Sequence, residues 1–233
     1  MSINSFYNCI DMGDLIYSLL FCKLLDVKTL YVDGGCGKVK FDWNSANFLL
    51  PLIKNQPYLN TVELYNGQEF DCDYGLHPDN IPVVLGANLL QYHSSKFGVD
   101  PESRRLNNEI WMTADRDESV IDKKVLINRS ARYHGDSRFY HMILSTNPIS
   151  DFLFAGLESE YLTFRQEFNV PSLDFIKTDS SIKLASIIET VPVFLGNQSL
   201  ICAIATGLGK VCYVEYGRMA ANYLFNRQNI FYF

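Results

Sequence analysis

The feature that most constrains the fold is a repeated alternation of short apolar segments with longer segments of helical spacing. In the first part of the chain, strand-like segments at 6–10, 29–32 and 61–65 alternate with helical ones at 14–25, 45–53 and 80–98. Successive strands joined by helices cannot pair as hairpins, so they form a parallel sheet covered by helices. The pattern therefore predicts an α/β protein.

The alternation restarts after a polar run at 113–122, which has no apolar period and is predicted to be a linker. Strands are expected at 124–128, 151–156, 193–196 and 211–215, and helices at 137–144, 158–168, 181–190, 199–208 and 219–225. We therefore expect two Rossmann-like domains, residues 1–116 and 117–233, that face a cleft. Ligands of such sheets bind at the carboxyl ends of the strands.

The charge distribution bears on the class of ligand. The chain carries a net charge of −6, of which −5 falls in residues 1–116 and −1 in the remainder. A protein that grips nucleic acid through its phosphates normally has a basic surplus, so the charge gives nucleic-acid binding no support. A local basic cleft would have to come from Lys38, Lys40, Arg104, Arg105 and Arg138. An anion is more easily accommodated by the second half.

The remaining composition points to a cytoplasmic protein without a metal site. The six cysteines form no CxxC pair and are expected to be reduced thiols. No apolar stretch is long enough to span a bilayer. The histidines lack zinc-ligand spacing, and Asp71-Cys72-Asp73 is interpreted as an exposed loop rather than a metal-diphosphate motif. The segment 33–38 lacks residues that a phosphate loop requires, and the apolar residues 230–233 are expected to be buried, in this chain or in a partner.

The first candidate site is the turn after the first predicted strand. Gly13 allows a tight turn there, and Asp14 falls at the start of the following helix. An acidic residue at this position commonly stabilises the helix N-terminus. The alternative is that Asp14 faces the cleft and accepts a proton from a hydroxyl nucleophile.

Three further turns in the second half suit a nucleotide. Asn128, Arg129, Ser130 and Arg132 follow its first predicted strand, and two guanidinium groups suit an anion, although a solvated loop with one ion pair would look the same. Glu158 begins the next helix, where it would either hydrogen-bond ribose hydroxyls or only favour the helix dipole. Gly196, Asn197, Gln198 and Ser199 lead from a strand into a helix whose free N–H groups would receive a diphosphate; an ordinary turn capped by Ser199 is the alternative.

Taken together, these motifs resemble glycosyltransferase family 9, the ADP-heptose:lipopolysaccharide heptosyltransferases, which have the GT-B fold. The resemblance rests on Met12-Gly13-Asp14 with Ser18-Leu19, on the turn from Phe194 to Ser199, and on the helix from Ala203 to Lys210. The chain resembles more closely a set of short family-9-like proteins of phage and bacteria, with an asn-arg-ser-x-arg-tyr loop and a gly-asn-gln-ser turn.

The resemblance implies a metal-independent inverting glycosyltransferase that needs no cofactor beyond a nucleotide-diphosphate sugar as co-substrate. Asp14 would be the general base for a hydroxyl acceptor, a glycan or a modified base. Arg132 would neutralise the diphosphate, with Asn128 and Ser130 in the same loop; Glu158 would hold the ribose, and residues 196–199 would receive the diphosphate.

Gln198, Leu200 and Ala203 stand where the family usually has Asp, Gly and His. Two alternatives remain, a non-catalytic nucleotide or nucleotide-sugar binding protein and a phage glycosyltransferase acting on DNA bases.

Overall fold

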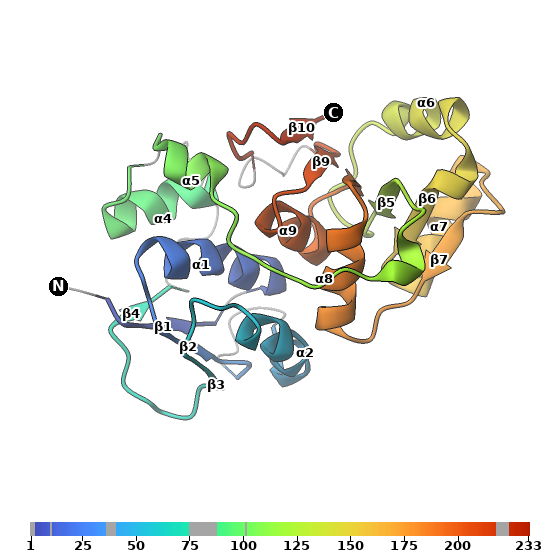
Figure 1. The fold of residues 1–233 in the computed structure, drawn as a ribbon. Helices are drawn as coiled ribbons and strands as arrows, with labels where there is room; N and C mark the ends of the chain where they lie inside the picture. The colour runs from blue at the N-terminus through green and yellow to red at the C-terminus, as the bar shows by residue number, and fades with distance from the viewer. Residues whose placement is uncertain (1–2, 10, 36–40, 75–87, 101, 218–223) are drawn as a thin grey trace.

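The chain forms two parallel sheets, each made by one half of the sequence (Figure 1). The computed structural model describes residues 3–9, 11–35, 41–74, 88–100, 102–217 and 224–233. The first sheet contains β1 (Ser5–Asn8), β2 (Thr29–Val32), β3 (Thr61–Leu64) and β4 (Cys72–Asp73). The second contains β5 (Val125–Asn128), β6 (Phe152–Ala155), β7 (Asp174–Ile176), β8 (Val193–Gly196), β9 (Val211–Val214) and β10 (Ile230–Tyr232). The predicted α/β class with two Rossmann-like halves is confirmed.

Helices connect most of these strands. The first half contains α1 (Met12–Leu24), α2 (Trp43–Lys54), α4 (Leu89–Phe97) and α5 (Arg104–Asn108). The second contains α6 (Arg138–Thr146), α7 (Glu158–Phe168), α8 (Ser181–Thr190) and α9 (Leu200–Gly207). Two short 3₁₀ turns, η1 (Glu118–Val120) and η2 (Ile149–Asp151), precede β5 and β6.

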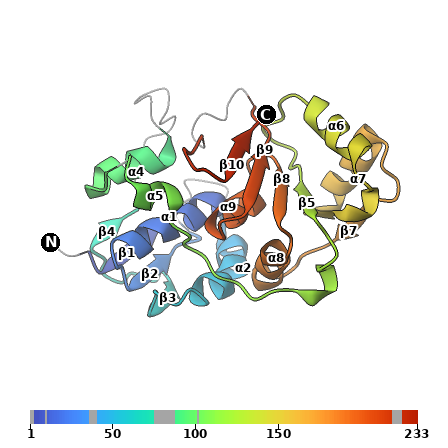
Figure 2. The ribbon, with the colours of Figure 1, turned by 45° about the horizontal axis from the view of Figure 1, so that its top comes forward.

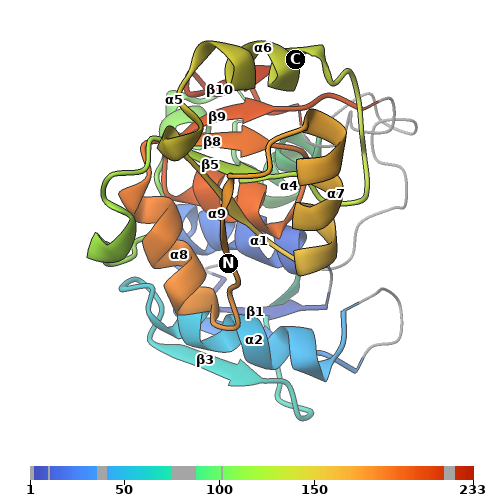
Figure 3. The ribbon, with the colours of Figure 1, turned by 90° about the vertical axis from the view of Figure 1, so that its right-hand side faces the viewer.

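The first sheet has the strand order β3-β2-β1-β4, and α1 and α2 lie on the face that is turned toward the second half (Figure 3). Alternate residues of β1 are buried: Phe6 and Asn8 are buried, and Ser5 and Tyr7 are partly exposed. Asn8 donates from Nδ2 to the hydroxyl of Ser18 on α1. Helix α1 is buried continuously from Asp14 to Cys22. It is apolar nearly all round because it packs on its own sheet and also on α9.

The second sheet has the order β10-β9-β8-β5-β6-β7, which contains a topological switch point. The chain leaves β5 through α6 toward β6, whereas it leaves β8 through α9 in the opposite direction, toward β9. Consequently α6 and α7 cover one side of this sheet and α8 and α9 cover the other (Figure 2). The loops after β5 and β8 diverge at the switch point, which is where ligands bind in open α/β sheets.

Two hydrophobic clusters stabilise the molecule. The larger joins the two halves, because it contains Phe6 and Leu19 from the first and Ile204 and Val214 from the second. The smaller lies between the second sheet and helices α6 and α7 and is rich in aromatic residues. The halves therefore meet through an apolar contact between α1 and α9.

Several sequence predictions need correction. Strands β4, β7 and β10 and helix α5 were not predicted. The helix expected at 80–98 is present as α4, while residues 80–87 lie outside the described part of the chain. Most of the helix expected at 219–225 also lies outside it, and Phe225, which is described, is not helical. Of the segment 33–38 that was compared with a phosphate loop, residues 36–38 lie outside the described part of the chain.

The cysteines and the membrane prediction can be compared with the structure directly. Cys22, Cys72, Cys202 and Cys212 are free thiols, but Cys9 is disulfide-bonded, so the expectation of six reduced cysteines is wrong there. Within the described residues, no helix is both long and apolar enough to cross a membrane. The predicted burial of the C-terminal segment holds for Ile230, whereas Phe231 on the same edge strand is 47% exposed.

Candidate functional site

The candidate site forms where the ends of β5 and β8 lie side by side. Asn128, the last residue of β5, is paired with Gly196, the last residue of β8. A Cβ atom on Gly196 would lie 2.0 Å from the carbonyl oxygen of Asn128, so only glycine allows this approach. The Asn128 side chain is buried and donates to the carbonyl of Ala155, at the end of β6. These two residues therefore build the floor of the site.

Asn197 connects the loop after β5 to the turn before α9 through hydrogen bonds of its side chain. It is fully buried, and its Oδ1 accepts from the backbone N–H and the hydroxyl of Ser130, at 2.9 and 3.1 Å. Its Nδ2 donates to the carbonyl oxygens of Ser130 and Arg132. With both ends of the amide used in this way, Asn197 fixes loop geometry.

The two arginines of this loop have opposite environments. Arg129 is 6% exposed, and its guanidinium is bound by the carboxylates of Glu215 and Glu167. Arg132 is exposed and lies over the ring of Tyr133, 5.4 Å from its centroid. Among the described residues, no carboxylate pairs with Arg132. The charge available to an external anion is therefore that of Arg132.

A small cavity of about 50 Å³, which we call the helix-end cavity, lies between the N-termini of α1 and α9. Its lining comes from the start of α1, the loop after β5 and the start of α9: Asp11, Gly13, Asp14, Tyr17, Arg132, Tyr133, Gln198, Ser199 and Leu200. Both helices present the positive ends of their dipoles here. The cavity thus combines a cation and two helix N-termini with carboxylates.

The two helix starts differ in capping. Ser199 caps α9, because its hydroxyl accepts from the N–H of Cys202. Asp11 occupies the same position before α1 but makes no side-chain capping bond. The two helices are close here, since a Cβ atom on Gly13 would lie 3.9 Å from that of Ala203. Asp14, in the first turn of α1, is 7% exposed and borders the cavity.

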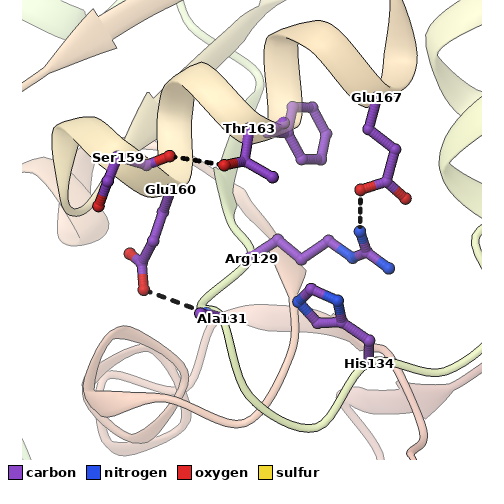
Figure 4. A pocket seen from close by; sticks show the side chains of 8 residues that line it. Arg129, Ala131, His134, Ser159, Glu160, Thr163 and Glu167 are labelled. Carbon is purple, nitrogen blue, oxygen red and sulfur yellow. Dashed lines mark hydrogen bonds and ion pairs between the residues drawn. The ribbon is translucent and has the colours of Figure 1, made fainter.

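A second cavity of about 210 Å³, the α7 cavity, lies between the loop after β5 and helix α7 (Figure 4). It is lined by Arg129, Ala131, His134, Ser159, Glu160, Thr163, Phe164 and Glu167. Glu160 accepts there from the backbone N–H groups of Ala131 and Leu157, at 3.3 and 3.2 Å. Nε2 of His134 lies 2.7 Å from the carbonyl oxygen of Ser130 and donates to it in the tautomer that carries the proton there.

The structure brings together one group of the predicted site residues and separates the others. Gly13, Asp14, Arg132, Gln198 and Ser199 line the helix-end cavity. Asn128, Ser130, Gly196 and Asn197 lie behind it in the framework of strand ends and loop. Arg129 lines the α7 cavity. Glu158 is exposed at the start of α7 and borders neither cavity.

Sequence reasoning assigned no site role to several residues of this region. Asp11, Tyr17, Tyr133 and Leu200 line the helix-end cavity and directly adjoin predicted positions or lie one helical turn from them. That spacing could have indicated them. Glu215, which binds Arg129, gives no local signal, because 86 residues separate the partners.

The described part of the chain bears on some residues of the alternative sites. Asp71 accepts from the backbone N–H groups of Asn4 and Ser5, so it fastens the chain near β1. No three acidic, histidine or cysteine side chains of the described residues are grouped so that they could hold a metal ion. Of the proposed basic cleft, Arg138 pairs with Asp136, Lys38 and Lys40 lie outside the described residues, and Arg104 and Arg105 begin α5.

Comparisons with known proteins identify the fold. No protein-family profile and no curated protein sequence matches the chain. A glycosyltransferase family 9 protein from Veillonella parvula has a similar structure, with a TM-score of 0.61 at 10% identity over 100% of this chain and 87% of that one. The ADP-heptose lipopolysaccharide heptosyltransferase II of E. coli gives 0.60 at 9% identity, over 99% and 90% of the chains.

A third similar structure is an E. coli heptosyltransferase solved with ADP, with a TM-score of 0.55 at 10% identity over 98% of this chain and 92% of that one. Coverage is nearly complete in all three comparisons, so the likeness includes both sheets and the helices between them. The chain therefore has the GT-B-like fold of the family 9 heptosyltransferases.

Proposed function

We propose that the protein is a glycosyltransferase that moves a sugar from a nucleoside-diphosphate donor to a hydroxyl acceptor, with inversion and without a metal ion. One observation carries the proposal: Asp14, Arg132 and the N-terminus of α9 line the same cavity, the helix-end cavity. A base and an anion-binding group are thus present on opposite halves of the molecule. The similar structures are glycosyltransferases, which supports this use of the fold.

In the proposed reaction, the Asp14 carboxylate removes the proton from the acceptor hydroxyl. The acceptor oxygen then bonds to the anomeric carbon while the bond from that carbon to the diphosphate oxygen breaks. The leaving nucleoside diphosphate takes the electron pair. Its developing charge is stabilised by Arg132 and by the first N–H groups of α9, which act as preorganised donors.

The donor would extend from the helix-end cavity across the second half. Its diphosphate would lie against Gly196, Gln198 and Ser199, with Asn128, Ser130 and Asn197 fixing the surrounding loops. Two carboxylates at the start of α7 are available to ribose hydroxyls: Glu158 on the exposed side and Glu160 in the α7 cavity. A nucleotide sugar and a hydroxyl acceptor are therefore the proposed substrates.

The decisive experiment combines binding with turnover. Calorimetry with ADP, UDP, GDP, CDP and dTDP, without added metal, would identify the donor class. Arg132→Ala is expected to weaken diphosphate binding about tenfold to a hundredfold, because this is the loss in affinity that corresponds to one hydrogen bond to a charged group. Arg138→Ala is the matched control, because that exposed arginine pairs with Asp136 outside the cavity. Absence of binding by all five diphosphates would reject the donor site.

Transfer is then tested in Asp14→Asn, which preserves the shape of the side chain but removes the base. We expect the rate of transfer from the matching sugar nucleotide to fall by about 10²–10⁴ while diphosphate affinity stays unchanged. A variant with undiminished transfer would show that Asp14 is not the base. A wild-type protein that binds the sugar nucleotide without transferring it to any hydroxyl acceptor would be a binding protein on the same fold.

A further inference from the structure

The loop of residues 129–135, which we call the Arg132 loop, is held at both ends by one buried carboxylate. At its start, Arg129 donates to Glu215 through Nε at 2.8 Å and Nη2 at 2.9 Å. At its end, the backbone N–H of Gly135 donates to the same carboxylate at 2.7 Å. Both ends of the loop are therefore joined through a single side chain that follows β9.

This ion pair is shielded from solvent. The side chains of Arg129 and Glu215 are 5% and 0% exposed. Glu167 on α7 accepts from Nη1 of Arg129 at 2.6 Å, and the Tyr140 hydroxyl donates to Glu215 at 3.2 Å. Burial alone would lower the pKa of Arg129, but the hydrogen bonds and charges of Glu215 and Glu167 raise it above its usual value. With these partners, the Arg129 charge is neutralised internally.

The middle of the Arg132 loop needs such restraint. Tyr133 has a φ of +58°, in the left-handed region that non-glycine residues rarely adopt. A strained residue of this kind persists only where its surroundings determine the conformation. The preceding Arg132 is exposed and lies over the Tyr133 ring, so its direction depends on the loop backbone.

We propose that Arg129 and Glu215 are positioning residues, which fix the Arg132 loop so that Arg132 and Tyr133 face the helix-end cavity. Neither is expected to contact a substrate. Glu215 extends the same restraint to the α9 turn, because its own N–H donates to the carbonyl of Gly196 at 2.6 Å. The inference rests on the proposed function only in assigning the diphosphate as the group that Arg132 meets.

The test replaces both partners together, with Arg129→Met and Glu215→Leu in one protein. Apolar replacement of both members of a buried ion pair is often tolerated, whereas removal of one member leaves an uncompensated buried charge. Glu167, the other partner of Arg129, is 36% exposed, so water solvates its carboxylate in the variant. The double variant therefore keeps a packed core while it removes the two attachments of the Arg132 loop to Glu215 and leaves those to Asn197 and Glu160 in place. The matched control is Lys124→Gln with Asp151→Asn, which removes an ion pair of 2.9 Å at the opposite end of the second sheet.

Two measurements are made on each folded protein. Trypsin cleavage after Arg132 reports on the loop without any ligand, and we expect it to be at least about tenfold faster in the double variant. Calorimetry with ADP and with inorganic pyrophosphate reports on the site, and we expect affinity to fall by about tenfold or more, since small displacements of a positioned group are costly. The control should match the wild type in both.

The outcomes separate the inference from the proposed function. Wild-type cleavage and affinity in the double variant would overturn the inference, as would fast cleavage with unchanged affinity. If the wild type binds neither ADP nor pyrophosphate, the proposed function fails, and an unchanged cleavage rate then also overturns the positioning role.

A second variant covers the case in which the double variant does not fold. Arg129→Lys keeps the charge beside Glu215 and Glu167 but cannot make two parallel N–H bonds. We expect its rate of trypsin cleavage and its affinity for ADP and pyrophosphate to lie between those of the wild type and the double variant. The temperature of thermal unfolding should stay unchanged. Wild-type behaviour of this variant in both measurements would contradict the role of the bidentate geometry.

Discussion

Strands β8 and β5 approach closely at Gly196, and this approach is possible because glycine has no side chain. A Cβ atom there would meet the Asn128 carbonyl oxygen at 2.0 Å and the Phe194 ring at 2.6 Å. Because the nearer atom is backbone, it cannot turn aside. We expect Gly196→Ala to lower the free energy of unfolding by about 1–3 kcal/mol, as overpacking does, measured by urea denaturation.

Gly13→Ala is the control for this prediction. Its Cβ would lie in ordinary contact with Ala203, and alanine is the better residue inside a helix. The free energy of unfolding should therefore stay unchanged or rise by up to about 1 kcal/mol. Equal effects of the two substitutions would show that the strand ends relax freely.

At the same scale, the sequence could indicate residue types but not their partners. It placed Asp14, Arg132, Gln198 and Ser199 near one another through their position after strands, and these four share a cavity. The residues alone could not distinguish Arg129 from Arg132, which stand three positions apart in the same loop; only the family resemblance assigned the diphosphate to Arg132. Only the fold brings Glu215 and Glu167 to Arg129, and that contact determines which arginine remains available.

The helices α1 and α2 differ in how their N-termini are capped. The N-terminus of α2 is capped by a side chain, whereas that of α1, which borders the helix-end cavity, is not. Asp42 precedes α2, and its Oδ1 accepts from the N–H and the hydroxyl of Ser45, both at 2.8 Å. Asp11 precedes α1 without such a bond. We expect Asp42→Ala to lower the urea midpoint of unfolding and Asp11→Ala to leave it unchanged.

This capping effect should depend on pH in a defined direction. The bond from the Ser45 backbone, followed by that from its hydroxyl, lowers the pKa of Asp42 below its usual 3.8. A carboxylate with a depressed pKa in the folded state stabilises it fully above the usual value and loses this contribution as the pH falls through the folded value. The difference in urea midpoint between wild type and Asp42→Ala should therefore be full at neutral pH and disappear in acid. A constant difference would indicate lost packing instead.

Among the elements, periodicity predicted the longer segments and missed the shortest. β2, α7, α8 and β8 have the predicted bounds. β4, β7 and β10 contain only two or three residues, and segments of that length have no readable period. β10 is formed because it pairs with β9, which is a long-range contact that local sequence does not encode.

At the scale of the molecule, the two halves share one cluster of buried hydrophobic residues. Trp111, in the segment that joins them, is fully buried. Its indole N–H donates to the carbonyl of Ile16 on α1, while its backbone N–H donates to that of Gly207 on α9. The connecting segment is thus packed between the two helices. The polar composition of residues 113–122 predicted a linker. It could not reveal that Trp111 and Met112, just before this run, are buried.

A core shared in this way predicts that the two halves unfold together. Trp111 fluorescence in a Trp43→Phe background, far-ultraviolet circular dichroism and calorimetry should report one transition with the same midpoint. Leu19→Ala on α1 and Ile204→Ala on α9 each remove a fully buried side chain of the shared cluster. Each should lower the free energy of unfolding by about 2–5 kcal/mol and shift all three probes equally. If residues 1–116 and 117–233 unfold independently, two transitions will appear and each substitution will shift only its own, because the other half would not sense the cavity.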